Sequence, residues 1–259
     1  MEIFLYAGAF ILGTIIGSFL NVVVLRFGTG ESIVTEGSRC MTCNEGLKFY
    51  EMVPVLSYVT LRGRCRNCLS HISIQYPIVE AVTGIVFLLL FWQFGIPEVS
   101  LVGIVVGALP YIFFAILIAA SVYDIRHFIL PDLLLAIAAV VGIALALLDA
   151  TPLLIHLGGS LVMSILFFVI WGVSKGKWMG FGDVKLAVVV GLILNIQQAV
   201  LGLLFSFWIG ALWGIFLIMF KGYSRKMQIP FGPFLVLGAF IAFTVGTQFL
   251  AWYNSLIGF

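Results

Sequence analysis

The sequence predicts an all-α, polytopic membrane protein with about eight transmembrane helices and a small cytosolic insert. Hydrophobic residues make up 63% of its 259 residues and charged residues only 9%, whereas soluble domains contain about 25% charged residues. Apolar runs long enough to cross a bilayer recur along the chain, and basic residues gather between alternate runs. Most of the chain is therefore expected to lie in a lipid bilayer.

A helix needs about 20 apolar residues to cross a hydrocarbon core of about 30 Å. The first apolar run is long enough to span and has no basic residues before it, so no cleavable signal peptide is expected. The predicted spanning helices are at about 3–25, 77–94, 101–123, 131–149, 154–174, 182–196, 199–220 and 230–252. The resulting regions are a first helix at 1–25, a cytosolic insert at 26–76 and a seven-helix transmembrane region at 77–259.

The basic residues predict the orientation of these helices. All 13 Lys and Arg lie within 26–66, at Arg126, within 175–185 or within 221–226. These four stretches are alternate connections of an eight-helix chain, and basic connections stay in the cytosol. Both termini are therefore expected outside. The net charge is only +2 and no basic face remains once the loops are assigned, so nucleic-acid binding is not expected.

Four cysteines in the insert are spaced as metal ligands. Cys40 and Cys43 form one C-x2-C pair, and Cys65 and Cys68 form a second pair after 21 intervening residues. Two such pairs supply the four thiolates of a tetrahedral zinc site. The alternatives are two disulfides or four unpaired thiols, and a reducing cytosol disfavours disulfides.

One structural zinc ion per chain is expected, because about 50 residues without an evident apolar core need such a cross-link. Four thiolates leave no open position, so this zinc is not expected to catalyse a reaction. His71 lies close to the second pair in sequence and is interpreted as a surface histidine.

Three aspartates lie at predicted helix ends near the cytosolic face. Asp124 ends the third helix, Asp132 opens the fourth after Pro131, and Asp183 opens the sixth in Gly180-Phe-Gly-Asp-Val-Lys-Leu. A carboxylate within a spanning helix costs roughly 2.5–3.5 kcal/mol on insertion scales, so it usually faces a polar cavity and has a function there. All three are expected at one depth.

Two carboxylates a few ångströms apart share one proton. The ionised one can draw a proton from a water that attacks a peptide carbonyl, while the protonated one donates to the carbonyl oxygen. Asp124 and Asp183 are the predicted pair. Gly180 and Gly182 would let the backbone approach an extended substrate closely.

Structural interpretations of these acids remain open. Asp132 can cap the fourth helix or orient the site. Asp183 can pair with Lys185 or cap the sixth helix. Asp124 can form an interfacial ion pair with Arg126.

Two further alternatives concern the acids within the membrane. Glu80, near the start of the second helix, can hydrogen-bond within the bundle or contact substrate. A transporter or channel would use intramembrane acids to bind protons or cations, but it does not account for a cytosolic zinc module or for acids near one face.

The ordered motifs resemble those of the bacterial type IV prepilin peptidases, also called leader peptidases, over nearly the whole chain. One departure is Met41, where a proline after the first cysteine is common in the family. The matching segments are Gly17–Arg26, Leu61–Cys68, Ile72–Glu80, Asp124 with Leu130–Asp132, Gly180–Leu186 and Ile229–Phe234.

The resemblance implies an aspartic endopeptidase of the G-x-G-D type in the bacterial cytoplasmic (inner) membrane, with Asp124 and Asp183 as its catalytic pair. Gly180, Gly182, Asp132 and Lys185 would support this site. Members of the family cut the short basic leader of type IV prepilins or type II secretion pseudopilins after a glycine. Many also methylate the new N-terminus with S-adenosylmethionine, for which no glycine-rich fingerprint or binding residue is evident here. Some members lack the cysteines, which implies that zinc is not part of the peptidase chemistry.

Overall fold

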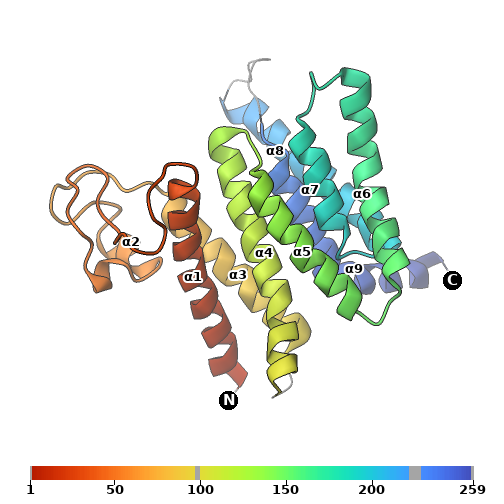
Figure 1. Ribbon diagram of the computed structural model, residues 1–259, viewed down its shortest axis with the longest axis horizontal. Coiled ribbons are helices and arrows are strands. Elements are labelled where there is room, and N and C mark those ends of the chain that lie inside the picture. Colours follow the sequence, from red (N-terminus) through yellow and green to blue (C-terminus); the bar gives the residue numbers. More distant parts are fainter. Residues whose placement is uncertain (1, 97–99, 222–228, 258–259) are drawn as a thin grey trace. The chain divides into compact units, whose positions relative to one another are not determined.

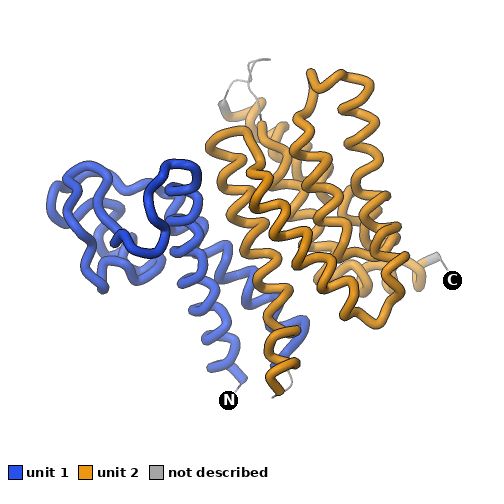
Figure 2. The backbone as a smooth tube through the Cα atoms, in the orientation of Figure 1, with its two compact units in different colours: residues 1–98 blue, residues 99–259 orange. Residues whose placement is uncertain are grey.

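The computed structural model describes residues 2–96, 100–221 and 229–257, and these residues are helical apart from connections and two isolated β-bridges. The chain divides into two compact units, residues 1–98 and residues 99–259 (Figure 2). Of the predicted cytosolic cations, Arg225 and Lys226 lie outside the described residues.

The first unit is a pair of long helices with the insert between them in sequence. Helix α1 (Glu2–Arg26) packs against α3 (Gln75–Phe94), and the insert contains η1 (Phe49–Glu51) and α2 (Leu56–Thr60) (Figure 1). The two long helices touch through small residues, because a Cβ on Gly17 would meet the Cα of Glu80 at 2.7 Å. Such close approach of small residues is typical of helix packing in membranes.

The second unit is a bundle in which α7 packs against three neighbours, α5, α6 and α9 (Figure 1). Large aromatic residues fill its centre: Phe113, Phe114 and Phe167 are almost completely buried. The helices are α4 (Leu101–His127), α5 (Asp132–Leu148), α6 (Leu153–Ser174), α7 (Phe181–Gly191), α8 (Ile196–Lys221) and α9 (Gly232–Ile257).

A helix lies at each of the eight predicted positions, but not every one is long enough to span a membrane. Among the described residues, six helices are long and apolar enough to cross a membrane, namely α1, α3, α4, α6, α8 and α9. Helix α5 has 17 residues and α7 has 11, so α7 is about 16 Å long and does not cross a core of about 30 Å by itself. The prediction of a sixth spanning helix at 182–196 is therefore wrong in length.

The end of α7 is fixed by close contact with α6. A Cβ on Gly191 would meet the backbone nitrogen of Ser160 at 2.8 Å and the carbonyl oxygen of Gly159 at 2.9 Å. The Ser160 hydroxyl donates to the carbonyl oxygen of Val188 at 2.8 Å. The chain then turns through buried residues 192–194 before α8 begins. These backbone contacts explain why the helix stops before residue 196.

Candidate active site and metal centre

Asp124 lies near the C-terminal end of α4. The helix continues for three residues beyond it to His127, where the prediction ended the helix at about 123, and Phe128 follows in the left-handed conformation. Asp124 is only 6% exposed, and its Oδ2 has no hydrogen-bond partner among the described residues. Among the described residues, no ion pair joins Asp124 to Arg126, so the interfacial ion pair considered above is not formed.

Asp183 lies in the first turn of α7, whose N-cap residue is Gly180. The Asp183 carboxylate is half-buried and interacts electrostatically with Asp124. Around Gly180 the space is open, whereas a Cβ on Gly182 would contact the Cβ of Leu130 at 3.3 Å. The two carboxylates are 59 residues apart in sequence (124 and 183) but within electrostatic reach of each other, and their role as a pair stays a prediction.

Asp132 and Lys185 join the same region by an ion pair. The Lys185 Nζ lies 2.7 Å from Asp132 Oδ1, and the ammonium also lies 5.6 Å from the centre of the Phe181 ring. Lys185 therefore pairs with Asp132 and not with Asp183. The side chain of Asp132 does not cap α5: it is the first helical residue, after the N-cap Pro131.

Two groups beside Asp124 were not singled out by the sequence. A Cβ on Gly232, the first residue of α9, would lie 2.7 Å from Asp124 Oδ2. The Ser121 Oγ is buried without a hydrogen-bond partner among the described residues. Ser121 lies one helical turn before Asp124, so the two side chains share a face of α4. The ordered motif around Gly232 was the only sequence signal for either group.

The four cysteines converge in the insert, where their Sγ atoms all lie within 4.8 Å of one another. None is in a disulfide, and the Sγ atoms of Cys40 and Cys68 are 3.8 Å apart. Two thiolates on one tetrahedral zinc, each at about 2.3 Å, are separated by about 3.8 Å. The donor set can therefore hold a metal ion, and its geometry fits zinc.

The two C-x2-C pairs form matching turns. In the first, the Cys40 N–H donates to the Glu45 carbonyl and the Asn44 N–H donates to the Cys40 carbonyl; in the second, Cys65, Ser70 and Leu69 repeat both bonds. Asn44 and Leu69 take corresponding left-handed positions, with φ of 57° and 58°. Backbone N–H groups of Cys43 and Thr42 lower the pKa of the Cys40 thiol to about 6.

The two remaining candidates of the first unit, His71 and Glu80, have structural surroundings. His71 is exposed and is not one of the clustered ligands. Glu80 is buried in α3, and its Oε2 accepts the Val55 backbone N–H at 2.7 Å. Of the two interpretations of Glu80, hydrogen bonding within its own unit is therefore the one that the structure contains.

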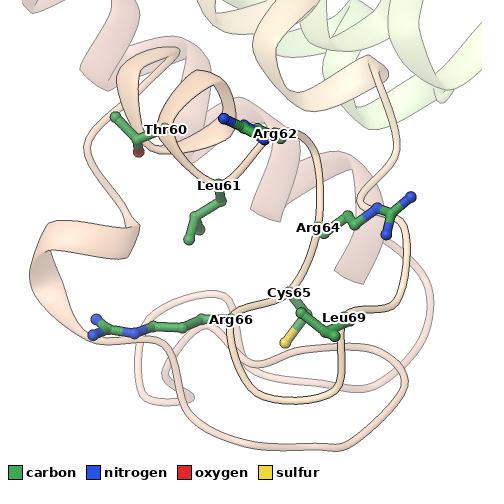
Figure 3. A pocket seen from close by; sticks show the side chains of 7 residues that line it. All are labelled: Thr60, Leu61, Arg62, Arg64, Cys65, Arg66 and Leu69. Carbon is green, nitrogen blue, oxygen red and sulfur yellow. The ribbon is translucent and has the colours of Figure 1, made fainter.

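A surface hollow of about 590 Å³ lies beside the second cysteine pair (Figure 3). Arg62, Arg64 and Arg66 line it, but the guanidinium groups of Arg64 and Arg66 point away from each other. Arg66 donates to the Tyr50 hydroxyl at 2.7 Å. The three cations therefore do not converge on one ligand position.

Comparison with known proteins assigns the family. Residues 11–94 match the Bacterial Peptidase A24 N-terminal domain, and residues 111–215 match the Type IV leader peptidase family. The chain belongs to the type IV leader peptidase family. This membership identifies the chain as a protease of the kind that the ordered motifs indicated. It argues against the alternative interpretation as a transporter or channel.

The relatives of this leader peptidase include bacterial proteins named "Prepilin leader peptidase/N-methyltransferase". One from Pseudomonas putida is 32% identical over 97% of this chain and 94% of its own length, and one from Bacillus subtilis is 30% identical over 95% and 97%. One from Myxococcus xanthus is 37% identical over 82% of this chain, which spans 63% of that relative. No solved structure matches the chain.

Proposed function

We propose that this leader peptidase cleaves the short basic leader of type IV prepilins or type II secretion pseudopilins after glycine, with Asp124 and Asp183 as the catalytic pair. The observation on which this rests is that α4 and α7 bring two carboxylates within electrostatic reach. Among the described residues, no cation neutralises either one. Uncompensated paired acids in a membrane protein are functional by default.

The chemistry follows from two acids that share one proton. The ionised carboxylate takes a proton from the attacking water, and the neutral one donates its proton to the oxygen of the scissile carbonyl. The carboxylic acid that results then protonates the departing amine. Two adjacent acids supply both proton transfers, so the proposed peptidase step uses no ligand from the cysteine cluster.

Four residues are proposed to support the pair. Gly180, which has open space beside it, would let an extended substrate backbone approach the start of α7, and Gly182 would support the same turn by admitting Leu130. Asp132 and Lys185 tie the start of α5 to α7 two residues after Asp183. We assign them to positioning because their ion pair lies on the protein surface.

We infer that Cys40, Cys43, Cys65 and Cys68 hold one structural zinc ion. Four thiolates fill its coordination shell, so the ion would fix the two matching turns without binding substrate. The names of the relatives further support methylation of the newly exposed N-terminus with S-adenosylmethionine. The proposed location is the bacterial inner membrane, with both termini outside and both sites at the cytosolic face, in keeping with the distribution of basic residues.

The catalytic assignment is tested with purified protein and a prepilin whose leader ends in glycine before phenylalanine. Asp124→Asn and Asp183→Asn should each abolish cleavage while leaving thermal unfolding unchanged. Asp149→Asn is the matched control, because Asp149 lies in the connection between α5 and α6, outside the proposed pair. If Asp124→Asn still cleaves and Asp132→Asn does not, the assignment of the pair is wrong.

A further inference from the structure

We propose that Gly232 is a positioning residue for the Asp124 carboxylate, so that the first turn of α9 is a third component of the peptidase site. This inference rests on the proposed role of Asp124. Gly232 lies beyond residues 111–215, which match the leader peptidase family. It opens α9, a helix that packs against both α4 and α7.

Space, rather than backbone conformation, is what makes glycine necessary at this position. Gly232 is not among the glycines with positive φ, so its conformation is open to other residues. A Cβ there would meet Asp124 Oδ2 at 2.7 Å and Leu186 Cδ2 at 3.4 Å. Real Cβ atoms do not approach a heavy atom to 2.7 Å, so either the carboxylate or the helix would have to move.

The backbone of this turn also brings an N–H group toward the carboxylate. Helix N-termini leave their first N–H groups without intrahelical partners. Pro233 has no N–H, and the N–H groups of Phe234 and Leu235 donate to the Phe231 carbonyl oxygen. The Gly232 N–H is the group of this turn that interacts with the Asp124 carboxylate.

Asp124 provides an independent reason to expect a partner here. Its side chain is more than nine-tenths buried, and Oδ2 makes no hydrogen bond of good geometry within the described part of the chain. A buried carboxylate without partners is costly, whereas the positive end of a helix favours a nearby negative charge. Gly232 thus both admits the carboxylate and directs the end of α9 toward it.

The test compares three glycine-to-alanine variants in the full-length protein. In Gly232→Ala the new methyl group meets the Asp124 carboxylate. In Gly238→Ala, two turns further along α9, it meets Ser206 and the carbonyl oxygen of Gly202, both on α8. In Gly214→Ala it enters open space.

Gly232→Ala should lower kcat for leader cleavage by about 100-fold, as expected for a catalytic group displaced by about 1 Å, with KM and thermal unfolding unchanged. Gly238→Ala should lower the unfolding temperature while the remaining folded protein keeps its kcat. Gly214→Ala should match the wild type in both. This split between kcat and stability separates positioning of Asp124 from helix packing.

Three results would overturn the inference. Gly232→Ala could keep the wild-type kcat, it could lose stability as Gly238→Ala does with normal kcat per folded molecule, or it could raise KM alone. Asp124→Asn is measured alongside. Cleavage by Asp124→Asn would refute the catalytic pair itself, whereas an inactive Asp124→Asn with a fully active Gly232→Ala would refute only the role of Gly232.

Discussion

Removing the ion pair between Asp132 and Lys185 should weaken leader cleavage without abolishing it. The pair connects the first residue of α5 with the fifth residue of α7, two residues after Asp183. Asp132→Ala and Lys185→Ala each remove one partner, and the double variant removes both. If the two residues act only through each other, the double variant should cleave no more slowly than the slower single variant.

The expected magnitude follows from the exposure of the pair. The Lys185 side chain is 40% exposed and the Asp132 side chain 75%, so water and salt screen their attraction. Exposed pairs contribute about 0–1 kcal/mol, which corresponds to at most about a fivefold change in an equilibrium or a rate. We therefore expect kcat/KM for prepilin to fall by up to about fivefold in each variant, and less at high salt.

The assay measures cleavage of a reconstituted prepilin by mass, at low and high ionic strength. Lys177→Ala is the control, because Lys177 is an exposed cation in the connection before α7 and has no ion pair in the described residues. Loss of cleavage by Asp132→Ala as complete as that of Asp124→Asn would refute the reasoning, since it would make Asp132 a catalytic residue. Losses that multiply in the double variant would show that the two side chains act independently.

Three other changes test the structural parts. Purified protein should contain about one zinc ion per chain, and Cys40→Ser should lose it together with the fold of the insert; a zinc-free, fully folded wild type would contradict this. Glu80→Ala should lower the free energy of unfolding by about 1.5–3 kcal/mol, because it removes a charged acceptor, and Glu80→Gln, which keeps an acceptor, should cost less; equal losses would exclude this reason. Asn195→Ala should lower the free energy of unfolding by about 1–3 kcal/mol, because it removes the Oδ1 that accepts the N–H of buried Gln198. Gln197→Ala, at an exposed position, should leave the same free energy unchanged.

The long helices could be predicted because one physical requirement fixes them. A span must satisfy its own backbone hydrogen bonds across the hydrocarbon, so apolar run length alone placed α1, α3, α4, α6, α8 and α9 within a few residues. The clustered cysteines were equally predictable, because two C-x2-C turns leave few arrangements that do not gather four thiols.

The contacts between helices could not be predicted in the same way. Run length does not reveal that Gly191 touches the backbone of α6, so the early end of α7 was missed. No local sequence pattern relates Gly232 to Asp124. The two positions (124 and 232) are 108 residues apart and meet only because α9 packs against α4. Lys185 was expected to pair with its neighbour Asp183 or to support the site. In the structure it pairs with Asp132, which lies on another helix, α5.

The short α7 bears on the proposed position of Asp183 near one face of the membrane. A helix of 11 residues covers about 16 Å, roughly half of the hydrocarbon core, so a chain that enters at one surface must turn back inside the bilayer. Irregular backbone is tolerated there only where protein covers it. The turn meets this condition: residues 191–194 are buried, the Asn195 N–H donates to Gln198 Oε1 at 3.2 Å, and the Gln198 N–H donates to Asn195 Oδ1 at 2.9 Å. These bonds let α7 end within the bundle, so the proposed position of Asp183 at the cytosolic face does not require α7 to cross the bilayer.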